Sequence, residues 1–427
     1  MPNETPAAKS TETVPAPANQ RLMLLDALRG FDMFWIIGAD ALVYALQRIA
    51  DGFQGKVAEG EGSPLYRFVK FLARQLQHAD WEGFRFYDLI FPLFIFIAGV
   101  SLVFSLTKTI EREGRAKALR RVIQRGLLLF LIGIFYSGGL TSEWPDIRLM
   151  GVLNRIGLAY LFAGVLFCFL KPRGLMVACV ALLAGYWALM TFLPFPDVRP
   201  TPDTAYIGKE NGFTSLQKIN LASTNMISGT FIKGVNLANY VDQKYLPGRK
   251  YDGTWDPEGI LSTLPAVATC LLGVFAGLLL KNSTMADMRK VTWLVGFGIA
   301  GVALGWLWSL QFPVVKKIWT SSYVLVAGGY SSILLGLFYL VVDVWKRQSW
   351  CQPFVWMGMN SITIYLASNF IGGFRKLSAR LVGGDLKTFF DGSVVAGFGD
   401  LVISIVGLLL AFWFVRFLYQ RKIFLRL

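Results

Sequence analysis

His78 is the only histidine in the chain, and it opens the polar stretch 78–83 directly before the apolar run 88–99. An imidazole titrates near neutral pH and can serve as a general base or a nucleophile. His78 is therefore the first candidate for acid–base chemistry. A solvated loop histidine at the edge of a membrane would give the same pattern, and from the spacing alone both interpretations stay open.

Several charged residues lie in or beside apolar segments, where a charge is costly and usually faces a cavity or another charge. They are Asp26, Arg29, Asp32, Asp40, Asp88, Arg148, Arg155, Asp256 and Glu258. Structural pairing would explain Asp26 with Arg29 and Asp256 with Glu258 equally well. Asp40 has no partner nearby in the sequence, and beside His78 it would orient the imidazole or stabilise its charge.

Sequence patterns for several other chemistries are absent. There is no P-loop, no Gly-x-Ser-x-Gly nucleophile elbow and no Cys/His spacing for a metal, so we expect no metal ion. The four cysteines lie in apolar segments or a short connection, which implies no disulfide framework. Gly273-x-x-x-Gly277 and Gly301-x-x-x-Gly305 predict close packing of helices.

The composition indicates which elements must position these residues. Of the 427 residues, 54% are hydrophobic and 16% are charged, whereas soluble domains carry about 25% charged residues. A run of about 20 apolar residues crosses a bilayer as a helix, because lipid leaves backbone groups no other hydrogen-bonding partner. We predict an all-α membrane bundle of about ten spans. They are 25–47, 86–106, 122–139, 151–170, 174–194, 259–280, 291–310, 320–343, 353–372 and 395–418.

Two stretches differ from the apolar segments. Residues 1–20 are rich in Pro, Ala and Thr, and we predict a disordered cytoplasmic tail before a membrane domain over 21–427. Residues 195–258 form a long polar stretch, predicted to be an exterior loop. Its Asn, Tyr and Trp side chains would suit a sugar or an ordinary cap equally well. They are Asn225, Asn236, Asn239, Tyr240, Asp242, Tyr251 and Trp255.

Basic residues indicate the orientation in the membrane. The stretch 108–125 carries seven Lys or Arg residues, and shorter basic connections occur at 171–173, 281–290, 346–347 and 421–426. All fall on one side if there are ten spans, and the positive-inside rule places that side and both termini in the cytoplasm. The net charge of +15 then reflects topology and anionic lipid, and we identify no nucleic-acid module. In a bacterium, the cytoplasmic membrane would be the location.

A series of short motifs runs along the chain from about residue 21 to 427. They are Leu25-Asp26-Ala-Leu-Arg29-Gly30, His78-Ala-Asp-Trp81-x-Gly83, Asp88-Leu-Ile-Phe91-Pro92, Arg148-x-x-Gly151-Val-Leu-x-Arg155-Ile-Gly157, Asp256-Pro257-Glu258-Gly259-Ile-Leu261, Leu272-Gly273-Val-x-Ala-Gly277, Lys317-Ile-Trp319-Thr-Ser-Ser322-Tyr323, Gly358-Met359-Asn360-Ser361-Ile362 and Lys422-Ile-Phe. In these motifs and their order, the chain resembles the heparan-alpha-glucosaminide N-acetyltransferase family, including its bacterial relatives, within the transmembrane acyltransferases.

The resemblance implies an activity and a role for His78. The family acetylates a glucosamine amine across the membrane from cytosolic acetyl-CoA, and its active-site histidine matches His78. An asparagine near that histidine matches Asp40, and this departure affects the expected chemistry and substrate. We therefore expect an acetyl-CoA-dependent N-acetyltransferase with His78 and Asp40 as catalytic residues. His78 would act either as a base or as an acetyl-accepting nucleophile.

Further binding residues are hypotheses. The residues expected to bind acetyl-CoA are Arg120, Arg121, Arg125, Asn360, Ser361 and Trp319. The residues expected to bind the acceptor are Asp88, Arg148, Arg155, Asp256 and Glu258. The expected partners are acetyl-CoA, an exterior amino sugar or glycan and the lipid bilayer, with a second copy of the chain as a further candidate. Two alternative functions stay open: a glycan O-acyltransferase, and a transporter or flippase that uses the same polar cavity without chemistry.

Overall fold

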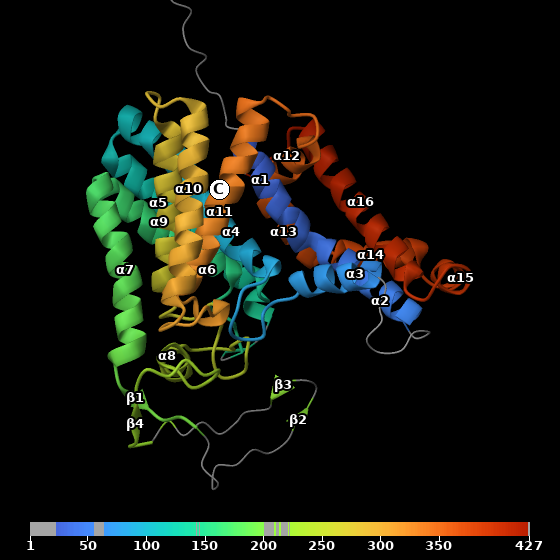
Figure 1. Ribbon diagram of the computed structural model, residues 1–427, viewed down its shortest axis with the longest axis horizontal. Helices are drawn as coiled ribbons and strands as arrows, with labels where there is room; N and C mark the ends of the chain where they lie inside the picture. The colour runs from blue at the N-terminus through green and yellow to red at the C-terminus, as the bar shows by residue number, and fades with distance from the viewer. Residues whose placement is uncertain are drawn as a thin grey trace, which may run out of the picture.

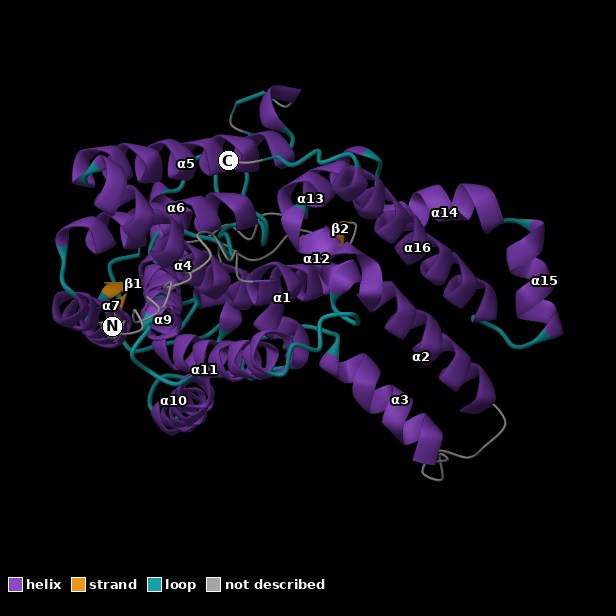
Figure 2. Cartoon of the chain, turned by 90° about the horizontal axis from the view of Figure 1, so that it is seen from above, coloured by secondary structure: helices purple, strands orange, loops and turns teal. Residues whose placement is uncertain are grey.

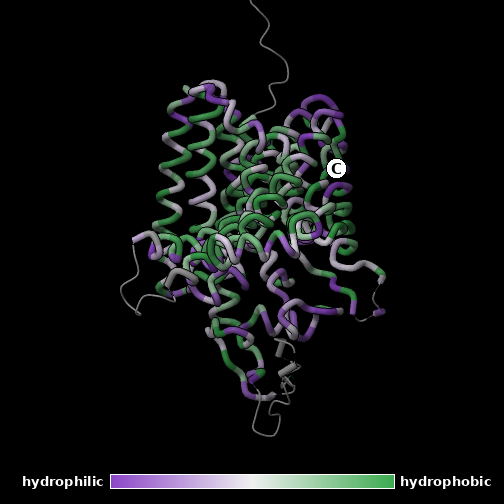
Figure 3. The backbone as a smooth tube through the Cα atoms, turned by 90° about the vertical axis from the view of Figure 1, so that its right-hand side faces the viewer, coloured by the Kyte–Doolittle hydropathy of each residue, from purple (hydrophilic) through white to green (hydrophobic). Residues whose placement is uncertain are grey.

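The computed structural model describes residues 23–54, 64–141, 143–144, 146–199, 209–210, 213–214, 221 and 223–425. The predicted tail, 1–20, lies outside these residues. Nearly all the described secondary structure is helical (Figure 1), which confirms the prediction of an all-α bundle. The hydropathy of the backbone places apolar residues along the long helices and polar residues toward their ends (Figure 3).

Eight helices within the described residues are long and apolar enough to cross a membrane. They are α4 (Phe86–Glu113), α5 (Arg115–Tyr136, extended by η2, Gly139–Thr141), α6 (Val152–Phe169), α7 (Pro172–Phe192), α9 (Thr263–Lys281), α10 (Asp287–Trp308), α11 (Ser321–Phe338, extended by η5, Tyr339–Val344) and α16 (Phe398–Gln420).

Two of the ten predicted spans are broken. The first consists of α1 (Met23–Phe34), η1 (Trp35–Ala39) and α2 (Asp40–Gln54), bent by 48° near Gly38, whose φ is 144°. Counting it as one span gives nine candidates in the described chain. The segment predicted at 353–372 is divided at Asn360 between α12 (Gln352–Met359) and α13 (Ser361–Phe370). With 8 and 10 residues, each is shorter than the roughly 20 residues of a crossing helix.

Small residues let the central helices approach closely. A Cβ added at Gly273 of α9 would lie 1.9 Å from the carbonyl oxygen of Phe96 in α4, and one at Gly305 of α10 would lie 2.8 Å from that of Ser322 in α11. No side chain fits at such distances, so both glycine pairs pack helices, as the sequence predicted.

The described part of the predicted exterior loop, 195–258, forms a folded cap. Strand β1 (Phe195–Pro196) pairs with β4 (Met226–Ile227), β2 (Lys209–Glu210) pairs with β3 (Phe213–Thr214), and both pairs are antiparallel. Helix α8 (Leu237–Tyr245) follows them. Its Leu237 and Tyr240 pack with Tyr186 of α7 and with Phe312, so the cap is tied to one end of the bundle.

Short amphipathic helices form a separate layer beside the long helices. They are α3 (Pro64–Gln75), α14 (Phe374–Val382) and α15 (Asp385–Ser393). Together with α2 and α16 they extend away from the main bundle (Figure 2). Val43 of α2 and Leu76, directly after α3, pack with Phe86 at the start of α4, which places this layer at the end of the bundle where α4 begins.

Candidate active site

The loop between α3 and α4 carries His78 and is fixed to a neighbouring loop. The Gly83 N–H donates to the Val314 carbonyl oxygen at 2.9 Å, and Glu82 forms a β-bridge with Val315. Trp81 Nε1 donates to the Phe231 carbonyl oxygen in the cap at 2.7 Å. The φ of 115° at Gly83 lies in a region that glycine adopts without a steric penalty. These contacts hold the His78 loop against the bundle.

The buried carboxylate of Asp88 orients the His78 ring. Its Oδ1 lies 2.9 Å from His78 Nδ1, and its Oδ2 accepts the backbone N–H groups of Ala79 and Arg85 at 3.1 Å each. Because Asp88 accepts at both oxygens, we assign the His78 proton to Nδ1, which leaves a lone pair on Nε2. The His78 side chain is 52% exposed, so it is accessible to a substrate.

Lys316 is a third member of this group, and it is not among the site residues that the sequence predicted. Its Nζ lies 3.0 Å from His78 Nδ1 and 3.4 Å from Asp88 Oδ1. Because the Nδ1 proton points to Asp88, the Lys316 ammonium does not donate to the ring, and its interaction is the ion pair with Asp88. It belongs to η4 (Lys316–Ile318), and burial lowers the pKa of Lys316, while the charge of Asp88 opposes this shift. In the sequence, Lys316 directly precedes the family motif that starts at Lys317, and this position could have indicated it as a site residue.

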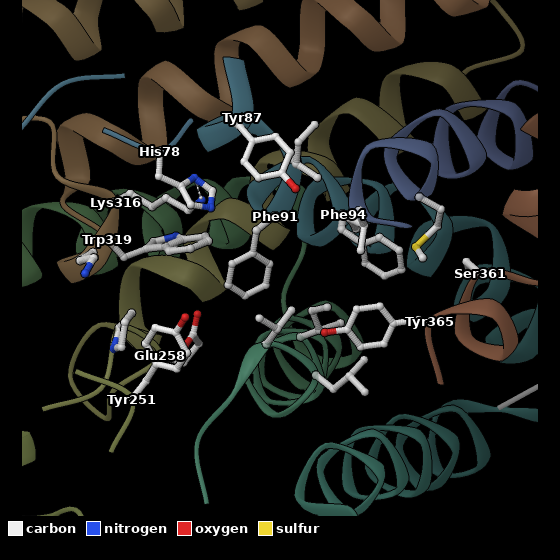
Figure 4. A pocket seen from close by; sticks show the side chains of 18 of the residues that line it. His78, Tyr87, Phe91, Phe94, Tyr251, Glu258, Lys316, Trp319, Ser361 and Tyr365 are labelled. Atoms are coloured by element: carbon white, nitrogen blue, oxygen red, sulfur yellow. Dashed lines mark hydrogen bonds between the residues drawn. The ribbon is translucent and has the colours of Figure 1, made fainter. Parts of the chain in front are cut away.

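His78 and Lys316 line a cavity of about 360 Å³. The end of the bundle that holds this cavity is called the His78 end below. His78, Lys316 and Glu258 lie together at one end of the cavity, and Phe94, Tyr365 and Ser361 lie at the other (Figure 4). Apolar side chains from α1, η1, α4, α6 and α13 line the space. The apolar lining comprises Met33, Ile36, Ile90, Phe91, Phe94, Val152, Leu153, Ile156 and Ile362.

Glu258 and Arg148 line the same cavity, and Glu258 lies on the wall across from His78 (Figure 4). Arg148 donates to both oxygens of Asp256, at 2.9 and 2.8 Å, and to Glu258 Oε2 at 2.8 Å. Burial works against ionisation of Asp256, but Arg148 outweighs it and the pKa of Asp256 is lowered. Burial, followed by the charge of Asp256, raises the pKa of Glu258 to about 7.

Arg155 supports this wall from behind. It is fully buried, and its guanidinium lies 4.8 Å from the ring centroid of Trp319, which lines the cavity. It donates to the Ser262 hydroxyl, and Trp319 Nε1 donates to the Thr269 hydroxyl at 3.1 Å. Asn360, at the break between α12 and α13, is also buried and does not line the cavity. Arg155 therefore contacts the wall residue Trp319, whereas the Asn360 side chain donates to the Trp356 carbonyl oxygen at 3.2 Å.

The structure brings some of the predicted site residues together and separates others. The cavity is lined by His78, Arg148, Glu258, Trp319 and Ser361. Asp88 and Asp256 lie directly behind two of these. Asp40 is the first residue of α2, and its side chain lies outside the described part of the structure.

The three predicted CoA-binding arginines lie at the opposite end of the bundle. They are in the first half of α5, which begins next to the end of α4, and α4 is long enough to span about 40 Å. Arg121 donates to Thr109 at 3.3 Å, and the Arg125 guanidinium lies 4.8 Å from the Tyr160 ring. Arg120 is exposed to solvent.

Two polar side chains of the predicted cap set accept hydrogen bonds from nearby backbone N–H groups. The Asn236 side chain accepts the Asn239 N–H at 3.0 Å, and Asp242 accepts the Ile260 N–H at 2.9 Å. Tyr251 is the cap residue from the predicted set that lines the cavity. Over the described residues, no group of three or more His, Cys, Asp or Glu side chains is arranged to hold a metal ion.

Comparison with known proteins gives two kinds of match. A family model described as "Heparan-alpha-glucosaminide N-acetyltransferase, catalytic" matches residues 65–238. The proteins named heparan-alpha-glucosaminide N-acetyltransferase from Mus musculus and Homo sapiens are each 31% identical over 326 residues, which cover 68% of this chain and 48% of each relative. The chain thus spans about half the length of these relatives.

Proposed function

Because the chain resembles the heparan-alpha-glucosaminide N-acetyltransferase family over most of its length, we propose that it is a membrane-embedded acetyltransferase. It would move an acetyl group from cytosolic acetyl-CoA to an amino sugar, or a glycan that ends in one, on the exterior side. The observation that carries this proposal is one cavity shared by an oriented imidazole, His78, and a carboxyl group, Glu258.

In the direct route, His78 acts as a base. The acceptor ammonium first loses one proton to water, because only the neutral amine has a lone pair. Nε2 then takes a second proton from the nitrogen as it attacks the thioester carbonyl carbon. The C–N bond forms, the C–S bond breaks, and the thiolate leaves and recovers a proton. Asp88 keeps Nδ1 protonated and stabilises the imidazolium that forms, as the aspartate of a catalytic triad does. General-base catalysis of this kind contributes about 10²–10⁴-fold to the rate.

In a ping-pong route, Nε2 itself attacks the thioester, the C–S bond breaks and the thiolate leaves. The neutral amine then attacks the acetyl-imidazole, the C–N bond to Nε2 breaks, and the proton lost by the amine balances the one that the thiolate gains. The exposure of the His78 side chain supports both routes, because either one needs Nε2 to reach the substrate. Trapping of labelled acetyl on the protein before an acceptor is added would favour the ping-pong route. Labelling that needs the acceptor would favour the direct route.

Glu258 supports an amine as the acceptor. A free amino sugar is protonated at neutral pH, and the ammonium group gains from a nearby carboxylate. A sugar hydroxyl has no such requirement. Trp319 and Tyr251, which line the same cavity, offer aromatic surfaces to the sugar.

The donor would approach from the end of the bundle opposite the His78 end, where basic side chains of α5 would hold the phosphates of acetyl-CoA.

To test this function, purified protein is incubated with labelled acetyl-CoA and one acceptor at a time: glucosamine, glucose or a peptide amine. Mass spectrometry detects the acetylated acceptor. We expect transfer to glucosamine above the others, and we expect His78→Ala to lose at least about 100-fold. Asp80→Asn, in the same loop but exposed, is the matched control. Transfer to hydroxyl sugars alone would point to O-acetylation, and no transfer or thioester hydrolysis would favour a transporter.

A further inference from the structure

A second cavity, called the crevice below, lies at the bend between η1 and α2. It measures about 480 Å³ and is lined by apolar residues of η1 and α2 and, at one end, by Arg48, Arg375 and Asp400. Ile37, Ala41 and Tyr44 recur on one face of α2 and its approach, so they form a continuous apolar strip that leads to Arg48. Ile36 lines both this crevice and the His78 cavity, so the two are neighbours.

The charged end of the crevice has more cations than carboxylates. Asp400 accepts from Arg48 at 2.5 Å and Arg375 at 3.2 Å, and Lys387 Nζ lies 3.6 Å from it. Lys387 lies at the same distance, 3.6 Å, from Asp391. The Arg48 and Arg375 side chains are 64% and 53% exposed. A guanidinium has five N–H donors, so both arginines retain donors for a further anion.

The surrounding helices have the character of a membrane-interface layer. In α3, Phe68 and Phe71 are exposed beside Arg67, Lys70 and Arg74; in α14, Leu381 is exposed beside Arg380. Exposed apolar side chains combined with Lys and Arg are typical of helices that lie in the plane of the headgroups. Figure 1 shows α3 and α14 crosswise to the long helices. The crevice therefore opens at headgroup depth, on the His78 end.

We propose that this crevice binds a membrane lipid with a phosphate or diphosphate headgroup, and that this lipid carries the acceptor sugar to His78. The apolar strip of α2 takes the lipid chain, and Arg48 and Arg375 take the phosphate oxygens, for which the planar guanidinium is suited. A sugar attached to the headgroup would then enter the cavity on the other side of Ile36. The delivery step rests on the proposed acetyltransferase function; the binding step does not.

Binding is tested on the full chain in detergent, with a polyprenyl phosphate as the probe and native mass spectrometry as the readout. The Arg48→Gln/Arg375→Gln variant should bind at least about tenfold more weakly, the change expected for a lost charge-assisted hydrogen bond. The matched control, Lys376→Gln/Arg380→Gln, removes the same charge from α14 at positions that do not line the crevice, and it should bind like the wild type. The parent alcohol and inorganic phosphate should bind more weakly than the probe.

Equal losses in both double variants would overturn the proposal, because they would indicate unspecific attraction to a basic surface. Equal binding of the alcohol would overturn it as well. Activity separates the two hypotheses. If the wild type acetylates lipid-linked and free glucosamine, the crevice variant should lose only the lipid-linked reaction, and intact turnover of free glucosamine would show that it is folded. Arginine-dependent lipid binding without any acetylation would retain the crevice and refute the proposed function.

Discussion

His78 Nδ1 lies 2.9 Å from Asp88, a carboxylate with no exposed side-chain surface whose other oxygen is held by two backbone N–H groups. The sequence predicted Asp88 as a substrate-binding residue. In the structure it lies behind His78 and does not line the cavity, so we propose a positioning role for it. A fixed acceptor at Nδ1 determines which ring nitrogen is available to the substrate.

Asp88→Asn should reduce kcat by at least about tenfold with little change in KM, because an amide oriented to donate at Nδ1 would favour the tautomer with its proton on Nε2. Steady-state kinetics with Asp80→Asn as control would measure this. Near-normal kcat would refute a positioning role, and a rise in KM alone would restore the substrate-binding assignment.

Glu258 provides a pH prediction. Its pKa is raised to about 7, so the carboxylate is present above that pH and is lost as the pH falls below it. If Glu258 binds the acceptor ammonium, the KM for glucosamine should rise as the pH is lowered from 8 to 6. Glu258→Gln should have a high KM that does not follow pH over this range, while the pH dependence of kcat persists. A KM for the wild type that is constant from pH 6 to 8 would contradict the assignment.

The expected donor site and the expected acceptor site lie at opposite ends of α4. Helix α4 carries Asp88 in its first turn and ends at Glu113, next to the α5 arginines. A donor held at those arginines and an acceptor at His78 would therefore approach from opposite sides. This arrangement follows from the length of one continuous helix.

The α5 arginines should affect the donor alone. Arg120→Gln/Arg121→Gln should raise the KM for acetyl-CoA by about tenfold or more, because charge-assisted hydrogen bonds to phosphate are lost, and it should leave the KM for glucosamine unchanged. Lys117→Gln, an exposed cation on the same helix that pairs with Glu113, is the matched control. An unchanged KM for acetyl-CoA would limit these arginines to a role in topology.

Close packing of α1 on α12 gives a stability prediction. A Cβ at Gly30 would lie 1.7 Å from the Phe354 carbonyl oxygen, so Gly30→Ala must push the two helices apart. We expect a loss of about 1–3 kcal/mol, the usual cost of overpacking, seen as a lower Tm in detergent. Gly185→Ala, in α7 where no atom lies within 4 Å of the added Cβ, should keep or raise the Tm. Equal Tm changes in both variants would show that this contact does not limit stability.

For the whole molecule, the orientation in the membrane is the main prediction. We predict that the end of the bundle opposite the His78 end is cytoplasmic. Lys117→Cys and Lys422→Cys should then be shielded from an impermeant thiol reagent added outside, and Tyr245→Cys in the cap should react. The native cysteines are buried, so they should give little background. Labelling of position 117 or 422 from outside, or none at 245, would reverse or refute this topology.

The sequence by itself determined the class of fold and the central candidate of the site. Long apolar runs permit few structures in lipid other than helices, and a lone histidine in a family motif stands out without coordinates. The glycine pairs were also predictable, because small residues at spacing four mark close helix contacts. These features depend on the periodicity of one segment at a time.

Only the tertiary structure decided which residues meet. Lys316 lies 238 positions from His78 in the chain and 3.0 Å from it in space, and no periodicity encodes that proximity. The 353–372 segment is divided at Asn360, and the described part of 195–258 folds into a cap. Both features depend on packing against other helices, which local propensity does not describe. The same holds for Asp88 and Asp256. Their charge predicted a site, but their burial behind His78 and Arg148 determined on which side of the wall they lie.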